Sequence, residues 1–256
     1  MPTDELKLDV ETILAAKRRR LALRQDHVPI NAMIALANMQ KGSLSILTEV
    51  NDENDPVKLI GQIRHQDIYD PVAAALRYIR YGMDGIALFT DDKTYSKGMD
   101  DLTFITRGIN IPIIVQDYIL NTYHVAEARA AGASALTLYS SLLSPAELRE
   151  VVSITMRWRM TAIVQINDVA RLDAVSELSP HALAIGETAH FDPEHDLPAL
   201  ERLRPLVPHN TRVMPMGCMY RVEDVLAVMD IGVDAVIIDE SLLKHKASRE
   251  AILSLR

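Results

Sequence analysis

Residues 115–133 read VQDYILNTYHVAEARAAGA and carry the pattern of a buried strand that turns into a helix. An apolar run of strand length ends at Val115, and an alanine-rich amphipathic stretch follows after a polar turn. Asn121 is suited to cap the start of that helix, because its side chain can accept a hydrogen bond from an orphan amide. Gly132, just past the helix, favours the left-handed conformation that stops it. This stretch predicts one βα unit of a parallel sheet.

The same unit recurs, because short apolar runs alternate with longer amphipathic stretches from residue 44 onward. Eight strands close a β/α barrel, and the 256 residues fit the ~250 typical of that fold. We therefore predict the α/β class, with a single eightfold β/α (TIM) barrel over residues 44–256 and an N-terminal helical extension of the same domain over residues 1–43. The predicted strands are residues 44–50, 85–89, 111–115, 135–139, 161–165, 182–185, 212–216 and 235–238.

The composition excludes several classes of function. The formal net charge of -8 gives no electrostatic footprint for nucleic acid, so no nucleic-acid partner is expected. The one basic run, residues 17–20 (KRRR), is predicted to lie on a solvated helix face or to cover the bottom of the barrel. No apolar run approaches the ~20 residues that cross a membrane, and no signal-peptide pattern opens the chain. We therefore expect a cytoplasmic protein without membrane contact.

Metal and cofactor motifs are absent from the sequence. Cys218 is the only cysteine, which rules out an intrachain disulfide and a cysteine-rich metal site. The histidines show no metal-ligand spacing, so no metal is predicted. No glycine-rich phosphate loop follows a strand, so no nucleotide or other cofactor is predicted.

The order of the motifs resembles the indole-3-glycerol phosphate synthase family over nearly the whole chain. The family's strand-to-helix segment, R-K-D-F-I-x-D-x-Y-Q-I-x-E-A-R-x-x-G-A, is similar to residues 115–133, and its opening I-L-x-x-I-x-x-x-K-R is similar to residues 8–18. The resemblance implies a barrel enzyme that closes an indole ring with loss of carbon dioxide in tryptophan biosynthesis. It also implies that the N-terminal extension packs over the barrel and helps to form the substrate site.

The active site of such a barrel lies at the carboxyl ends of its strands. The resemblance places a family active-site glutamate at Glu49, with Asn51 in the position of a lysine, and the aromatic residue beside the acceptor ring at Tyr95. Gln116 stands where the family's lysine acts as general acid, and Gln165 stands where its glutamate acts as general base. A neutral amide serves neither role, and loss of a positioned acid typically costs ~10² to 10⁴ in rate.

The remaining candidate residues follow the predicted strands six to eight and bear on substrate binding. They are Gly186, Glu187, Met216, Gly217, Asp239 and Glu240. An asparagine and an arginine that the family uses for substrate are absent after strand six, and Met216 replaces another glutamate. Asp239 replaces a glycine whose neighbouring amides hold the substrate phosphate in the family. A carboxylate ~4 Å from a phosphate is unfavourable by roughly 4 kcal/mol per unit charge at an effective dielectric of 20.

The sequence therefore predicts a diverged relative that lacks the family's ring-closing decarboxylation and keeps a pocket for a small neutral or cationic ligand without phosphate. Two alternatives stay open at this point. The first is a genuine indole-3-glycerol phosphate synthase, a carboxy-lyase of tryptophan biosynthesis. The second is a non-catalytic binding or scaffold protein that uses the barrel exterior for a protein partner. If the chain is an enzyme at all, the resemblance implies a lyase of the synthase type.

Overall fold

The computed structural model describes residues 3–47, 56–63, 70–91, 97–188 and 190–254. Its strands form one parallel sheet that closes into a barrel, in the order β7-β6-β5-β4-β3-β2-β1-β9-β8. The short β8 follows β7 after two residues and pairs with β9, so the two together serve as the seventh barrel strand. The predicted TIM barrel is confirmed. The strands are β1 (Lys58–Ile63), β2 (Gly85–Phe89), β3 (Ile113–Gln116), β4 (Ala135–Tyr139), β5 (Thr161–Ile166), β6 (Ala182–Ile185), β7 (Arg212–Pro215), β8 (Cys218–Met219) and β9 (Ala235–Asp239).

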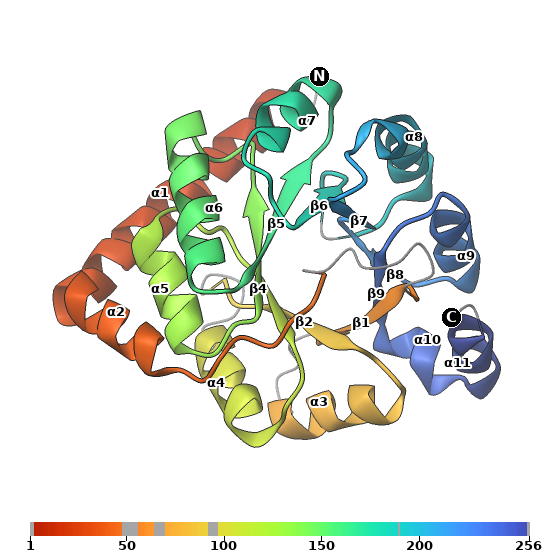
Figure 1. Ribbon diagram of the computed structural model, residues 1–256, viewed down its shortest axis with the longest axis horizontal. Helices are drawn as coiled ribbons and strands as arrows, with labels where there is room; N and C mark the ends of the chain where they lie inside the picture. Colours follow the sequence, from red (N-terminus) through yellow and green to blue (C-terminus); the bar gives the residue numbers. More distant parts are fainter. Residues whose placement is uncertain (1–2, 48–55, 64–69, 92–96, 189, 255–256) are drawn as a thin grey trace.

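Helices surround the barrel, and the N-terminal helices α1 and α2 lie on the outer side of α5 (Figure 1). The Asn121 side chain accepts a hydrogen bond from the His124 amide at 3.0 Å, as predicted for a helix cap. Gly132 has a φ of 100°, which is the left-handed conformation predicted for the helix stop. None of the helices in the described part of the chain is long and apolar enough to cross a membrane. The helices are α1 (Thr3–His27), α2 (Ile30–Met39), α3 (Pro71–Arg80), α4 (Gly98–Gly108), α5 (Thr122–Ala130), α6 (Pro145–Arg157), α7 (Val169–Ser176), α8 (Pro193–Leu203), the 3₁₀ turn η1 (Arg204–Leu206), α9 (Val222–Asp230), α10 (Glu240–Lys244) and α11 (Lys246–Leu253).

The predicted first strand, residues 44–50, is wrong, because the first barrel strand is β1 at Lys58–Ile63. Ile46 and Leu47 are instead buried against the amino-terminal ends of the strands. Thr161, the first residue of β5, donates its hydroxyl to the Ile46 carbonyl at 2.5 Å. Figure 1 shows this segment, in orange, running from α2 to the inside of the ring of strands. A short apolar run signals burial, and here the burial is achieved by filling the barrel bottom rather than by strand pairing.

The barrel interior is filled by apolar side chains that alternate along the strands. Because inward-facing residues recur at every second position, a residue two places after an interior side chain also faces inward. Layers of this kind form a packed core and leave functional side chains to the strand ends. The interior cluster includes Ile46, Ile60, Ala87, Ile114, Ala135, Ile163, Ala184, Met214, Met216, Cys218 and Ile237.

Gly61 on β1 faces outward and lies under the ring of Tyr78 from α3. A Cβ added at Gly61 would lie 2.1 Å from Tyr78 Cδ1, and the Tyr78 hydroxyl donates to the Gln62 carbonyl, which restrains the ring. We expect Gly61→Ala to lower the free energy of unfolding by about 1–3 kcal/mol, because overpacking forces side chains and backbone to shift. Urea denaturation measures this change. Gly42→Ala is the matched control, since a Cβ added at Gly42 would have no heavy atom within 4 Å; equal effects at both sites would contradict the packing argument.

Candidate functional site at the carboxyl ends of the strands

The polar candidates lie on inward-facing positions at the carboxyl ends of the strands, a region called here the carboxyl face. Ile60, Ile114 and Ile163 belong to the interior cluster, so the residues two places later, Gln62, Gln116 and Gln165, also face inward. Register pairs join these ends around the barrel: Gln62 pairs with Asp239, Phe89 with Gln116, and Tyr139 with Gln165. The structure therefore brings Gln116, Gln165 and Asp239 to one face of the barrel.

Gln62 and Gln116 form an amide pair across the interior. The Gln62 Nε2 atom donates to Gln116 Oε1 at 2.7 Å, and both side chains are about 1% exposed. On the intervening strand β2, the register partner of Gln62 is the small Ala87 and that of Gln116 is Phe89. Sequence reasoning missed Gln62, because the predicted first strand lies too early in the chain.

Gln165 is held at the end of β5 by the loop that follows β6. Its Nε2 atom donates to the Gly186 carbonyl at 2.6 Å. Gly186 has a φ of 138°, a conformation that favours glycine, and a Cβ there would lie 3.0 Å from Asp196 Oδ1. Glu187, the next residue, accepts a hydrogen bond from Asn167 Nδ2 at 3.1 Å. Gly186 and Glu187 therefore do lie next to Gln165.

Met216 and Gly217 form the break between β7 and β8. Met216 is buried in the interior cluster, and its amide donates to the Ile185 carbonyl at 2.9 Å. A Cβ at Gly217 would lie 2.2 Å from the Phe191 backbone nitrogen, so the crossing of the two chain segments requires glycine there. Both residues therefore serve packing, at a place that borders the carboxyl face.

Asp239 and Glu240 point in different directions. The Asp239 carboxylate accepts a hydrogen bond from the Ser241 amide at 2.9 Å and so caps the start of α10. Glu240 turns toward α3, where it pairs with Arg77 at 2.9 Å, and along its own helix it pairs with Lys244 at 3.5 Å. Asp239 thus belongs to the carboxyl face, whereas Glu240 is engaged on its outer side.

A buried ionic cluster fastens α1 to the carboxyl ends of β2 and β3. The ammonium group of Lys17 is fully buried and contacts Asp91 at 2.9 Å and, more closely, Asp117. Thr90 Oγ1 donates to the Asp117 carboxylate at 2.9 Å. His124 Nε2 lies 3.2 Å from the same carboxylate, which is within ion-pair distance, but the angle does not make it a hydrogen bond. The prediction of a solvated face for residues 17–20 is therefore wrong for Lys17.

The charges of this cluster control the ionisation of Asp117. Burial alone would raise the pKa of the Asp117 carboxyl, but the neighbouring His124 and Lys17 outweigh burial and hold that pKa well below its ordinary value. Asp117 therefore stays an anion over the whole physiological range. Its contacts bind the N-terminal extension to the barrel.

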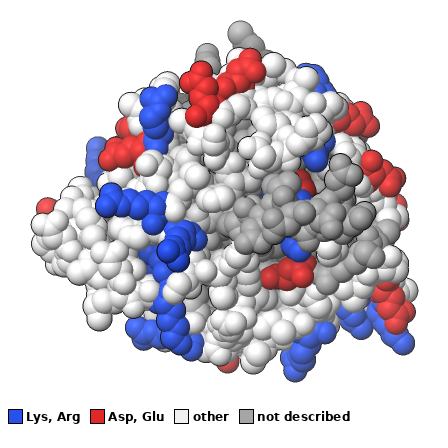
Figure 2. All heavy atoms as spheres, viewed as in Figure 1, with Lys and Arg blue, Asp and Glu red and all other residues white. Residues whose placement is uncertain are grey.

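The candidates Glu49, Asn51 and Tyr95 lie outside the described residues. Within the described part of the chain, no three His, Cys, Asp or Glu side chains come together as a group that could hold a metal ion. Figure 2 shows Lys and Arg side chains in a row on the left half of one face of the molecule. Acidic side chains lie at the upper and right edges of the same face. The polar side chains described at the carboxyl face are the amides of Gln62, Gln116 and Gln165 and the carboxylates of Asp239 and Glu187.

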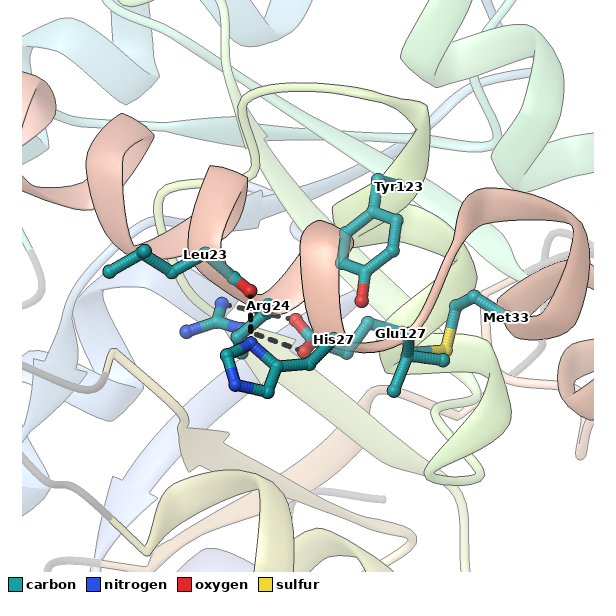
Figure 3. Close-up of a pocket in the computed structure, with 7 residues that line it drawn as sticks. Leu23, Arg24, His27, Met33, Tyr123 and Glu127 are labelled. Atoms are coloured by element: carbon teal, nitrogen blue, oxygen red, sulfur yellow. Dashed lines mark hydrogen bonds and ion pairs between the residues drawn. The ribbon is translucent and has the colours of Figure 1, made fainter.

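A separate pocket lies on the outer side of the molecule between α1, α2 and α5, and Figure 3 shows its side chains. Its walls are mostly apolar, and Arg24 forms an ion pair with Glu127 at 2.8 Å across it. His27 Nδ1 lies 2.7 Å from the Leu23 carbonyl of its own helix. The Arg24–Glu127 ion pair is a further link between the N-terminal extension and α5, away from the carboxyl face.

Comparison with known proteins assigns the family. Residues 10–255 match the family described as indole-3-glycerol phosphate synthase. The chain belongs to this family. An indole-3-glycerol phosphate synthase of Dehalococcoides mccartyi is 29% identical over 230 residues, which cover 89% of this chain and 86% of the relative. One of Acetivibrio thermocellus is 26% identical over 249 residues, which cover 97% of this chain and 93% of the relative.

A solved structure supports the architecture. A 3-hexulose-6-phosphate synthase matches with a TM-score of 0.60 at 16% identity, over 78% of this chain and 99% of its own. At that identity the likeness shows the barrel fold alone.

The position of β1 changes how the chain compares with the indole-3-glycerol phosphate synthase pattern A-E-V-K at the end of the first strand. With β1 at Lys58–Ile63, residues 61–64 (GQIR) stand at the end of the first barrel strand, where that pattern lies in the family. The assignment of the family glutamate to Glu49 rests on the predicted strand 44–50, and it stays a prediction because Glu49 lies outside the described residues. Asn51, to which the resemblance gave the lysine position, stays a prediction for the same reason.

Proposed function

We propose that this member of the indole-3-glycerol phosphate synthase family has lost ring-closing decarboxylation and binds a small ligand without a phosphate group at the carboxyl face. The observation that carries the proposal is the buried amide pair between Gln62 and Gln116. If β1, and not residues 44–50, is taken as the family's first strand, Gln62 stands in the position of the family glutamate. Gln116 stands in the position of the family's general-acid lysine. With Gln165 at the general-base position, three glutamines stand where the resemblance calls for charged groups.

The chemistry of amides supports this proposal. General acid–base catalysis needs a group that gains and loses a proton near the operating pH, and a side-chain amide does neither. The Gln62–Gln116 hydrogen bond also uses the Gln116 oxygen, so that side chain is fixed by a neutral partner. Loss of acid and base together is expected to remove far more than the ~10² to 10⁴ in rate that one group supplies.

The place where the family binds the substrate phosphate also supports the proposal. The Ser241 amide at the start of α10 already donates to the Asp239 carboxylate. A phosphate would have to displace that carboxylate or lie beside it, and the repulsion is roughly 4 kcal/mol per unit charge at ~4 Å and an effective dielectric of 20. An anionic ester is therefore a poor ligand for this end of the barrel. We also propose a cytoplasmic location, which the single cysteine favours.

The test is a synthase assay on the purified chain. The protein is incubated with 1-(o-carboxyphenylamino)-1-deoxyribulose 5-phosphate, and indole fluorescence is followed beside an authentic synthase. We expect turnover at least about 10⁴-fold below the control, since acid and base are both replaced. Turnover close to the control would contradict the proposal.

The second candidate is a genuine indole-3-glycerol phosphate synthase. The family match over residues 10–255 favours it, because the relatives that share the frame carry that name. On this alternative, groups other than the three glutamines would supply the proton transfers. The same assay decides between the two, since only the alternative expects ring closure at a rate comparable with the control.

A further inference from the structure

Three buried amide oxygens at the carboxyl face have no hydrogen-bond partner within the described part of the chain. They are Gln62 Oε1, Gln165 Oε1 and Asn167 Oδ1. Asn167 lies two positions after Gln165, so its side chain continues the same inward-facing row past the end of β5. Buried polar atoms in native proteins are nearly always paired, so three unpaired atoms at one face call for an explanation.

All three atoms are acceptors, and the hydrogen-bond partners fix two of the amide orientations. Gln165 Nε2 faces the Gly186 carbonyl, and Asn167 Nδ2 faces the Glu187 carboxylate. Both partners can only accept, so the nitrogen of each amide must lie toward its partner and the oxygen must lie away from it. The unsatisfied groups at the ends of β5 and β6 are therefore hydrogen-bond acceptors that require a donor.

A carboxylate stands beside these acceptors. Glu187 is exposed, its Oε1 atom is 3.1 Å from Asn167 Nδ2, and within the described residues it forms no ion pair with a Lys, Arg or His. Burial is the main cause that raises the pKa of the nearby Asp196, and the negative charge of Glu187 adds to the rise. The Glu187 carboxylate thus places a negative charge beside the acceptors at the ends of β5 and β6.

We infer that the ends of β5 and β6 bind the ammonium or guanidinium group of a small organic cation, an inference that rests on the proposed function because it names the ligand class of the same face. The N–H donors of such a group satisfy Gln165 Oε1 and Asn167 Oδ1, and Glu187 compensates its charge. Gln62 Oε1, on the opposite side of the barrel, accepts from a second donor of the ligand. A ligand with donors at both ends fits this arrangement, and an anionic acid of the same length does not.

Butane-1,4-diamine and butanedioate are a matched pair of probes, because they share a carbon chain and differ in the sign and hydrogen-bonding role of their ends. Calorimetric titration of the full chain is expected to show one-to-one binding of the diamine and none of the diacid. Glu187→Gln is expected to weaken diamine binding about tenfold, which corresponds to one charge-assisted hydrogen bond. Asn167→Leu is also expected to weaken it, because the ligand then loses the Oδ1 acceptor.

Glu201→Gln on α8 is the control, since Glu201 is an exposed acid whose loss changes the net charge equally. Less than about a twofold change is expected there, because Glu201 lies in the last turn of α8, away from the ends of β5 and β6, and solvent and salt screen a charge at that distance. The inference is overturned if the diamine does not bind, if butanedioate binds as tightly, or if both glutamate variants weaken binding equally. Failure of the proposed function has a different signature, since synthase turnover would contradict it while leaving the dependence of diamine binding on Glu187 intact.

Discussion

Lys17→Met is expected to lower the free energy of unfolding by about 3–5 kcal/mol, the typical cost of removing one partner from a buried ion pair. Lys17 is fully buried and neutralises Asp91 and Asp117, which are themselves 5% and 4% exposed. Methionine keeps an unbranched side chain of similar length but leaves both carboxylates without the ammonium group. For a chain of this size, the midpoint of thermal unfolding should fall by roughly 6–20 °C.

Circular dichroism melting and urea denaturation measure this change, and Arg18→Met is the matched control. Arg18 is the next residue of the same helix and is exposed, so its loss should stay within about 0.5 kcal/mol. A double variant, Lys17→Met with Asp117→Asn, is expected to recover part of the loss, since an amide is less costly to bury than an unpaired carboxylate. Equal stability of the Lys17 and Arg18 variants would mean that the cluster does not hold the extension.

The pH dependence of stability follows from the lowered pKa of Asp117. Because the folded-state pKa lies below the unfolded value of about 3.9, the stabilisation from this carboxylate is fully present above that pH. It is lost as the pH falls through the folded-state pKa. In Asp117→Asn this acid-side loss should be smaller than in the native chain, and denaturation curves below pH 4 measure the difference.

Helix periodicity is a sequence signal that places Lys17 on the buried side of α1. Leu14, Lys17 and Leu21 are spaced by three and four residues, and all three are buried, whereas Arg18 and Arg19 face solvent. The basic composition of residues 17–20 does not contain this signal, because composition alone does not say which of the four side chains is buried. The carboxylate partners of Lys17 come from residues 74 and 100 positions away, so no local pattern could have named them.

The barrel itself was predictable because its signals are local. Seven of the predicted strands correspond to strands of the structure, and Gly132 and Asn121 end and begin α5 as their chemistry requires. The prediction of the first strand was wrong because two apolar runs, residues 44–47 and Lys58–Ile63, both fit that role. An apolar pattern predicts burial, but it does not distinguish a strand from a segment that fills the bottom of the barrel. Because of that error, Gln62 was not among the predicted site residues. The pairing of Gln62 with Gln116 is a tertiary contact that no sequence spacing states.

Restoring charged groups at the three glutamine positions is expected to create ring-closing activity. The variant carries Gln62→Glu, Gln116→Lys and Gln165→Glu, which returns the family residue types to three inward-facing strand ends. Adjacent opposite charges at positions 62 and 116 then replace the 2.7 Å amide pair, so each of these two new charges has a partner. We expect turnover of the synthase substrate to rise at least about 10²-fold over the native chain, the smaller contribution of one positioned acid or base.

The control for this experiment is the same variant with Gln116→Met in place of lysine, which keeps the size of the side chain and supplies no proton. Because a proton donor is needed at that position, the control should stay about 10² to 10⁴-fold slower than the lysine variant. Adding Asp239→Gly removes the carboxylate that accepts from the Ser241 amide and frees that amide for phosphate, so it should lower KM more than it raises kcat. Equal rates for the lysine and methionine variants would show that a proton donor at the end of β3 does not limit ring closure, and would contradict this prediction.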